Sequence, residues 1–350
     1  MLAIAKETDA SQAVLMYMDY FPLGAILGKK AAIPVAGISF RPPQQIQGAF
    51  DFIKHKIWQS MLASGQISTV FSLVHAAVPV INALANGSID NLSNLAEARD
   101  TQTMIRLLAE KGPEADVLDA GTTMRFLTAY YAVTGDVKKM TGTPRMCERP
   151  IGILVDALRQ LGANIEYENK EGYPPLRLQG FQYAGKREIS IRGDVSSQFI
   201  SAILMLGPLL PEGICLKITG TLGSKPYVEM TLAQMAHFGI QAQVDWSKGQ
   251  IDIPAQSYQS THFAVESDWS GASYWYSMVA LSPFEDTQLE LLGLKENSLQ
   301  GDSAIQDIML PLGVKSTYTG RGFLLTKTKA EPTLAWDFSQ CPDLAQTICV

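Results

Sequence analysis

Clusters of small and hydroxyl-bearing residues stand at four places in the chain, each directly before an apolar segment with helical spacing. They open the runs AGTTMRFLTAYYA, VSSQFISAILML, DWSGASYWYSMVAL and CPDLAQTICV. A helix N-terminus has unpaired backbone N–H groups and a partial positive charge. Small residues there let an anion approach closely, although Ser and Thr are also common helix caps. Several such starts meeting in space would form an anion pocket, and the chain has no G-x-x-x-x-G-K-[ST] phosphate loop.

These starts recur at a nearly constant interval. Counted at Gly121, Ser196, Ser270 and Asp343, they repeat with a period of roughly 75 positions. A second marker is a helix-like segment that ends at a glycine and is followed by an alternating, strand-like tail. Its glycines, Gly162, Gly239 and Gly313, follow nearly the same period. Glycine ends helices because it adopts the left-handed conformation cheaply. Two markers with one period predict a repeated α/β unit of two helices and several strands.

The composition is that of a folded, acidic protein. Of 350 residues, 47% are apolar and 18% charged, and the formal net charge is −6. This composition argues against extensive disorder. The acidic balance argues against general nucleic-acid binding, which requires a surplus of basic residues. The length predicts two domains, and four cysteines without a C-x-x-C pair predict neither a disulfide scaffold nor a zinc site.

Two segments bear on localisation. The start MLAIAKETDASQ lacks the pattern of a secretory signal. Residues 67–85 carry no formal charge over a length that could span a bilayer. They also contain Ser, Thr, His, Pro and Asn, which membrane insertion disfavours. We therefore interpret this stretch as a buried helix or strand, and we expect a cytoplasmic protein that does not associate with membranes.

Longer motifs resemble one enzyme family. They are the run from LDAGTTMRFLTAYYA through TGTPRMCERPIGILVDALRQLGANIEY, and the segments DVSSQFISAILMLGPLL, GSKPYVEMTLAQMAHFG and DFSQCPDLAQT. Together they resemble the enolpyruvylshikimate-phosphate synthases, the 3-phosphoshikimate 1-carboxyvinyltransferases of the shikimate pathway of aromatic amino acid biosynthesis. The resemblance extends from about residue 85 to the end of the chain.

The resemblance implies a fold and a reaction. The implied fold is α/β, a two-domain inside-out barrel built from repeated βαβαββ units. The implied reaction transfers the enolpyruvyl group of phosphoenolpyruvate to the 5-hydroxyl of shikimate 3-phosphate and releases phosphate, through a tetrahedral intermediate. It implies no cofactor and no metal, with the two small substrates as the only partners of a monomer. Because both substrates are anions, an acidic protein must concentrate positive potential locally.

The same resemblance implies roles for individual residues. Gly121 and Arg149 would contact phosphoenolpyruvate, since a bare glycine backbone allows close approach and a planar guanidinium suits phosphate or carboxylate. Asp343 would take the proton of the attacking hydroxyl and also contact shikimate 3-phosphate. The other expected contacts of shikimate 3-phosphate are Ser196, Ser197, Gln198, Ser224 and Tyr227, with Gln198 also touching phosphoenolpyruvate.

The chain departs from the family pattern at several points. The family's K-S-x-S-x-R signature has no counterpart in QISTVFSLVHAAVPVINALANGS, which contains neither Lys nor Arg. Its R-x-K-E-x-D-R stretch would follow Val350. A charge-assisted hydrogen bond contributes on the order of 1.5–3 kcal/mol, so one alternative is a catalytically impaired member that only binds shikimate phosphate. Asp119 adds a negative charge beside the anion site, which opposes binding unless it is neutralised.

A related transferase is a further alternative. The sister transferase that acts on UDP-N-acetylglucosamine uses a cysteine as an acid, and Cys147 lies in the corresponding part of the sequence, although the flanking RMCERP resembles the shikimate branch.

We expect an enolpyruvyl transferase domain with the shikimate-phosphate-binding half over residues 85–245. Residues 246–350 would form a second, partial domain. Residues 1–84 stay unassigned, with membership of the lower domain as one reading.

Overall fold

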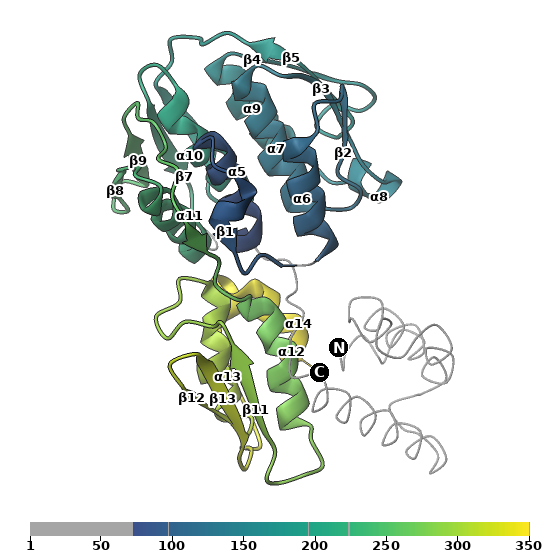
Figure 1. Cartoon of the computed structure of the whole chain (residues 1–350), viewed down its shortest axis with the longest axis vertical. Coiled ribbons are helices and arrows are strands. Elements are labelled where there is room, and N and C mark those ends of the chain that lie inside the picture. Colours follow the sequence, from purple (N-terminus) through teal and green to yellow (C-terminus); the bar gives the residue numbers. More distant parts are fainter. Residues whose placement is uncertain (1–72, 97, 195, 223–224, 350) are drawn as a thin grey trace.

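The computed structural model describes residues 73–96, 98–194, 196–222 and 225–349. Helices and strands alternate, so the α/β class is confirmed. The buried apolar side chains form two separate cores. One extends from Ala76 to Val265 and the other from Trp269 to Leu344. In Figure 1 the larger body holds the blue-to-green segments, and the smaller body holds the light-green-to-yellow ones.

The first repeated unit belongs to the larger core. Its elements are β2 (Glu114–Asp116), α7 (Gly121–Thr134), β3 (Val137–Thr141), α8 (Pro144–Cys147), α9 (Gly152–Leu161), β4 (Ala163–Tyr167) and β5 (Leu176–Phe181). The sheet has the order β2-β3-β5-β4, in which β2 and β3 are parallel and the other pairs antiparallel. Helix α9 buries Leu154, Leu158 and Leu161 and exposes Asp156 and Gln160. This is the one-sided pattern of a helix packed on a core.

The second unit repeats the first. Its elements are β6 (Glu188–Arg192), α10 (Ser197–Leu206), the short 3-10 helix η3 (Gly207–Leu209), β7 (Ile214–Thr219), α11 (Lys225–His237), β8 (Gln243–Asp245) and β9 (Gln250–Ile253). The sheet order β6-β7-β9-β8 has the same sequence of one parallel and two antiparallel pairs. Helix α10 is apolar almost all round because it lies against α7, α9 and α11.

The third unit has the same element order but a different sheet. Its elements are β10 (Phe263–Ala264), α12 (Trp269–Ala280), β11 (Gln288–Leu292), η4 (Gly301–Ala304), α13 (Ile305–Met309), β12 (Val314–Tyr318) and β13 (Gly322–Lys327). The sheet is β11-β13-β12, without the parallel first strand of the other two. Strand β10 pairs instead with β1 (Leu92–Ser93), so it links the third unit to the larger body.

Glycines in the left-handed conformation follow the main helices of the repeated units. Gly162, Gly239 and Gly313 have φ of 114°, 89° and 90°, in the left-handed region. At Gly162 the need for glycine is twofold, because a Cβ would also lie 1.8 Å from the carbonyl oxygen of Gln182. The predicted helix–glycine–strand marker is thus confirmed after α9 and α11, whereas a turn separates the end of α13 from Gly313; the expected strands β4, β8 and β12 follow all three glycines.

The segment before the first unit packs into the larger core. It contains α5 (Leu73–Leu84), η2 (Ile89–Asn91), β1 and α6 (Arg99–Ala109). Helix α5 contacts α6, α7 and α11, and its residues from Ala76 to Ile81 are buried. The expected buried helix is therefore present in the described part of residues 67–85. In the part of the chain that the structure describes, no helix is both long and apolar enough to cross a membrane.

Two expectations differ from the structure in detail. A boundary between residues 245 and 246 would cut the hairpin of β8 and β9, whereas the two cores divide after Val265. The fourth start, at CPDLAQ, begins with a 3-10 turn, η6 (Pro342–Leu344), preceded by η5 (Phe338–Gln340), before the four-residue helix α14 (Ala345–Ile348). The first three starts open longer α-helices, namely α7, α10 and α12.

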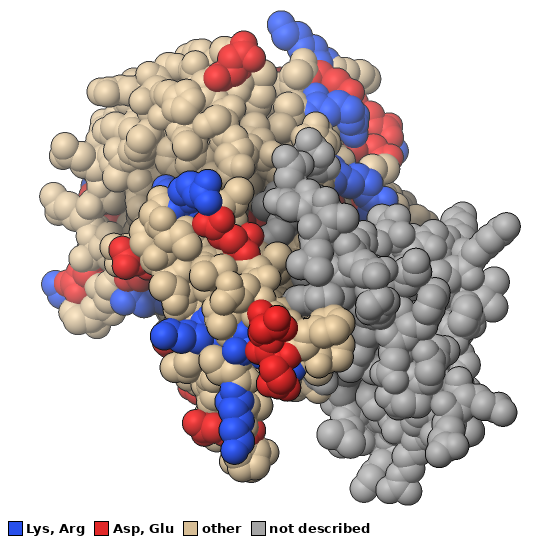
Figure 2. Space-filling view, turned by 60° about the horizontal axis from the view of Figure 1, so that its bottom comes forward, with Lys and Arg blue, Asp and Glu red and all other residues tan. Residues whose placement is uncertain are grey.

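Charged residues lie in small mixed groups. On the face seen in Figure 2, Lys and Arg side chains stand beside Asp and Glu among uncharged residues. Among the ion pairs of the described residues are Lys217–Glu188 (2.8 Å) and Arg321–Glu290 (2.9 Å). An anion site on this protein therefore depends on the few cations that lie directly beside it.

Candidate functional site

The start of α7 brings two guanidinium groups against one glycine. Gly121 is the first residue of the helix, and Ala120 before it provides no side-chain cap. A Cβ at Gly121 would lie 2.2 Å from Nη1 of Arg149 and 2.7 Å from Nη1 of Arg125. The absence of a side chain is what permits this approach. The helix N-terminus and two cations are thus concentrated at one point, a combination that favours an anion.

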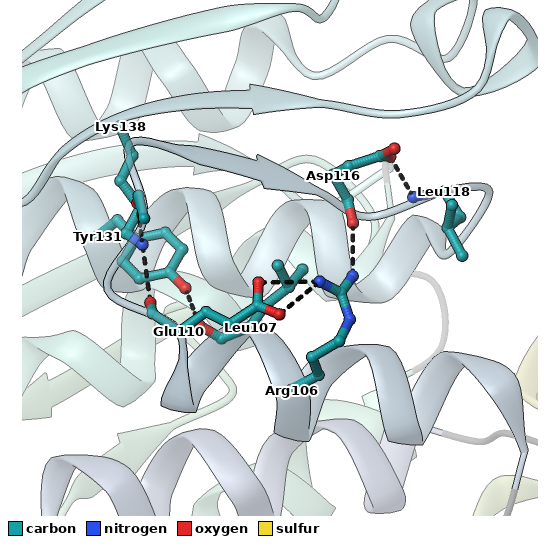
Figure 3. Close-up of polar contacts among 8 residues, drawn as sticks. Arg106, Leu107, Glu110, Asp116, Leu118, Tyr131 and Lys138 are labelled. Atoms are coloured by element: carbon teal, nitrogen blue, oxygen red, sulfur yellow. Dashed lines mark hydrogen bonds and ion pairs between the residues drawn. The ribbon is translucent and has the colours of Figure 1, made fainter.

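A network of hydrogen bonds fixes the loop that leads into α7 (Figure 3). Arg106 on α6 donates to the carbonyl oxygen of Asp116 (3.1 Å), whose carboxylate accepts from the N–H of Leu118 (2.8 Å). Tyr131 on α7 donates to the carbonyl oxygen of Leu107 (2.5 Å). Lys138 on β3 donates to the carbonyl oxygen of Glu110 (3.0 Å). These contacts tie α6, α7 and β3 together and so position the turn before Gly121.

Arg125 holds the two sides of this site together. Its Nη1 donates to the carbonyl oxygen of Gly121 (2.7 Å), and its Nη2 donates to that of Pro150 (3.4 Å), next to Arg149. The side chain is 5% exposed, and its Nε has no hydrogen-bond partner within the described residues. Burial, and then the charge of Arg149, lower the pKa of Arg125 to about 10. Two close cations that repel each other favour the binding of an anion between them.

Two carboxylates lie at the edge of the same site. Asp119 accepts two hydrogen bonds from Nη2 of Arg99, at 2.5 and 2.6 Å. This ion pair neutralises the negative charge that would otherwise oppose the binding of an anion. Burial raises the pKa of the neighbouring Asp100, the charge of Asp119 raises it further, and Arg99 and Arg149 lower it. The positive charges of Arg99 and Arg149 thus both favour the ionised form of Asp100 beside the α7 start.

The start of α10 is joined to the start of α7 by one side chain. Ser196 caps α10 and accepts from the backbone N–H of Gln198 (3.3 Å). The side-chain Nε2 of Gln198 donates to Oγ1 of Thr122 (3.0 Å), the residue after Gly121. Ser196 is exposed and Ser197 is half-buried. The first turns of the two helices therefore lie together, although they belong to different repeated units of the sequence.

Tyr227 and Asp343 belong to different bodies of the molecule, and their charges influence each other. Tyr227 is a buried residue of α11, and Asp343 lies in η6. Burial is the main cause that raises the pKa of Tyr227, and the nearby charges of Asp302 and Asp343 raise it further. The carboxyl of Asp343 reaches solvent, but the surrounding protein still desolvates it and raises its pKa. Asp343 is consequently a stronger base than an ordinary aspartate.

The expected site residues therefore fall into two groups. The first group contains Gly121, Arg149 and, through Thr122, Gln198; the second contains Tyr227 and Asp343. A hydrogen bond of 2.9 Å from Thr231 to Ser201 joins α11, which carries Tyr227, to α10, which carries Gln198. Ser224 lies outside the described residues.

Sequence reasoning overlooked two arginines of the first group. Arg125 could have been found, because it stands one helical turn after Gly121, at the spacing at which helix positions share a face. Arg99 offered no such signal, since its partner Asp119 lies in a different element of the chain. Within the described residues, no group of three or more His, Cys, Asp and Glu side chains is arranged to hold a metal ion.

Comparison with known proteins shows which family the chain resembles. Residues 93–350 match the family model described as EPSP synthase (3-phosphoshikimate 1-carboxyvinyltransferase). A protein of that name from Bacteroides fragilis (strain YCH46) is 49% identical over 273 residues, which cover 77% of this chain and 65% of the relative. One from Cellvibrio japonicus is 40% identical over 242 residues, covering 68% of this chain and 56% of the relative. The chain thus spans a little under two thirds of these relatives.

A solved structure agrees at the level of the fold. The EPSP synthase from Acinetobacter baumannii superposes with a TM-score of 0.61, covering 81% of this chain and 68% of that one, at 18% identity. The extent of the family match and the 49% identity decide the assignment. The chain belongs to the EPSP synthase family.

Proposed function

We propose that this chain carries the substrate site of a 3-phosphoshikimate 1-carboxyvinyltransferase. The reaction would transfer the enolpyruvyl group of phosphoenolpyruvate to the 5-hydroxyl of shikimate 3-phosphate and release phosphate. The observation that carries the proposal is the convergence of Arg125 and Arg149 on Gly121 at the start of α7. Cations and a helix N-terminus are the groups that bind a compact anion. The names of the curated relatives support the same reaction.

The first group of residues would hold phosphoenolpyruvate. Arg149 is exposed at the α7 start and would bind the phosphate or carboxylate with its planar fork. Gly121 would leave room for the anion to meet the helix N–H groups. Gln198, held by Thr122, would contact both substrates. These groups would act by orientation and by stabilising negative charge, the largest contributions that preorganised donors make to catalysis.

The second group, together with the serines at the start of α10 and before α11, would hold shikimate 3-phosphate and accept its proton. Ser196, Ser197, Ser224 and Tyr227 would bind the sugar acid, and Asp343 would take the proton of the 5-hydroxyl as its oxygen attacks C2 of phosphoenolpyruvate. The C2–C3 double bond takes up this oxygen at C2 and a proton from solvent at C3, which gives the tetrahedral intermediate. Loss of a methyl proton to solvent, together with cleavage of the C2–O bond to phosphate, then restores the double bond. The raised pKa of Asp343 supports its role as the base.

The domain arrangement follows from the same proposal. The three runs of strand, helix, strand, helix and two strands support repeated βαβαββ units, and we propose that they build the two-domain inside-out barrel of the family. The second domain, with its three-stranded sheet, would be a partial one. A monomeric, cytoplasmic enzyme remains the expectation from the family resemblance. The comparisons do not favour the transferase of UDP-N-acetylglucosamine.

The test is the release of phosphate by the full chain. We expect phosphate only when phosphoenolpyruvate and shikimate 3-phosphate are both present. Asp343→Asn should lower turnover by about a hundredfold or more, the usual contribution of a general base. Asp286→Asn, at an exposed position, is the matched control. No turnover with both substrates saturating would contradict the enzyme, and calorimetric binding of shikimate 3-phosphate would then identify the binding-only alternative.

A further inference from the structure

A buried carboxyl with no role in the proposed reaction lies where the two bodies meet. Asp302, 1% exposed, belongs to η4 of the third unit. One of its oxygens accepts a hydrogen bond from Oγ of Ser270, at the start of α12. The other, Oδ1, is buried and has no hydrogen bond of ordinary geometry within the described residues. A buried acceptor of this kind is costly unless it obtains a partner.

The hydroxyl of Tyr227 is a donor in the same situation. It comes from α11 in the other body, is buried, and likewise has no hydrogen bond of ordinary geometry among the described residues. The two groups nevertheless affect each other. Burial raises the pKa of Asp302 to about 6, and contact with Tyr227 opposes that rise, as does the hydrogen bond from Ser270. A small rotation or translation would therefore let the phenol donate to the carboxylate.

Backbone packing holds these side chains in register. Glycine at position 301 lets η4 approach α11, because a Cβ there would lie 3.5 Å from Cβ of Pro226, the residue before Tyr227. The same Cβ would lie 2.6 Å from the carbonyl oxygen of Gln340, so η4 also packs on the turn that leads to Asp343. The charge of Asp343 in turn raises the pKa of Asp302. The residue before Asp302 therefore packs both on α11 and on the turn before Asp343.

We propose that Asp302 is a positioning residue, whose carboxylate accepts from Ser270 and from Tyr227 and thereby latches the two bodies together beside Asp343. A phenol donating to a carboxylate is a charge-assisted hydrogen bond. The latch holds α11 of one body against η4 and η6 of the other. The latch itself does not depend on which ligand is bound. Its contribution to binding shikimate 3-phosphate rests on the proposed function.

The latch is tested without ligand by a double-mutant cycle on the full chain. The variants are Tyr227→Phe, Asp302→Asn and the two combined, with Asp307→Asn at an exposed position of α13 as control. Small-angle X-ray scattering measures the radius of gyration, and circular dichroism confirms that each variant is folded. We expect both single changes to increase the radius of gyration, the double variant to increase it no further, and the control to leave it unchanged. An unchanged radius in the single variants, or additive changes, would overturn the latch.

If Asp302→Asn does not fold, another variant still tests the latch. Ser270→Ala removes the other donor to Asp302 and, combined with Tyr227→Phe, leaves this carboxylate without both of its donors. We expect the radius of gyration of this combined variant to exceed that of the wild type. A radius equal to that of the wild type would overturn the proposal.

The role in binding is tested by calorimetry with shikimate 3-phosphate. We expect Asp302→Asn to weaken binding about tenfold, the effect of one hydrogen bond, with its circular dichroism spectrum unchanged. The double variant should bind no more weakly than the weaker single variant. If the wild type shows no heat but the radii of gyration are non-additive, the proposed function fails and the latch stands. If binding and radii are both unaffected by Asp302→Asn, the latch fails and the proposed function stands.

Discussion

Arg99 and Asp119 form an ion pair directly before helix α7, with Nη2 of the arginine 2.5 Å from Oδ1 of the aspartate. The pair lies at the edge of the site where Arg125 and Arg149 meet Gly121. Both partners are largely exposed, so the pair contributes little to folding stability, about 0–1 kcal/mol. Its importance is local, because it cancels a negative charge where we propose that an anion binds.

Removing this cation should weaken substrate binding through Asp119. In Arg99→Gln the carboxylate is left uncompensated, and we expect the KM for phosphoenolpyruvate to rise about fivefold, equivalent to about 1 kcal/mol of unscreened repulsion. The second change Asp119→Asn should restore the KM, since the repelling charge is then gone. Steady-state phosphate release at low ionic strength measures both effects, and added salt should reduce them. A KM that stays high in the double variant would show that Arg99 binds the substrate itself.

A methyl group at Gly121 should separate the two guanidinium groups. In Gly121→Ala the Cβ would lie 2.2 Å from Nη1 of Arg149 and 2.7 Å from Nη1 of Arg125, so both side chains must move. Arg149 is exposed and can yield, whereas Arg125 is buried and hydrogen-bonded, so we expect a modest fall of the unfolding midpoint and a fall of kcat/KM for phosphoenolpyruvate by about tenfold or more. Gly112→Ala is the matched control, since a Cβ there meets no atom within 4 Å. Equal activity of the two variants would argue against an anion bound at Gly121.

The repeated unit was predictable because each of its signals is local in the sequence. A glycine such as Gly162 ends its helix through its own backbone conformation, and Ser196 caps a helix whose first turn directly follows it. The contacts that complete the site depend instead on how units pack. In the sequence, Asp302 is one polar residue of a turn, and nothing near it indicates that α11 packs beside this turn. The pairing of β10 with β1, which joins strands on either side of the first two units, likewise has no local signal.

His75 should make the protein sensitive to mild acid. It is fully buried on α5, its Nδ1 accepts from the N–H of Ala96 (3.2 Å), and burial lowers its pKa to about 4. An imidazole with a folded-state pKa below the ordinary 6.5 stabilises the fold above pH 6.5, and this contribution is lost as the pH falls toward 4. The loss is about 3 kcal/mol in unfolding free energy, at about 1.36 kcal/mol per pKa unit.

The substitution His75→Asn isolates this contribution. The side-chain oxygen of Asn can accept the N–H of Ala96 but does not titrate, so the stability of this variant should fall less than that of the wild type between about pH 6.5 and 4.5. Urea unfolding across this range provides the measurement. His262→Asn, at an exposed position, should behave as the wild type does. Parallel pH profiles for His75→Asn and the wild type would show that His75 does not titrate in this range.

Gly162 should be among the glycines least tolerant of substitution. It combines φ of 114° with a site where a Cβ would lie 1.8 Å from the carbonyl oxygen of Gln182. Gly135, which ends α7 with φ of 82°, has open space around it. Gly135→Ala should therefore cost only the left-handed conformation, about 1–2 kcal/mol. Gly162→Ala must in addition displace the backbone beside β5 and should destabilise by about 4 kcal/mol or more, at the far end of the range for single changes. Urea denaturation of the two variants compares these costs, and equal losses would mean that the Gln182 backbone yields without resistance.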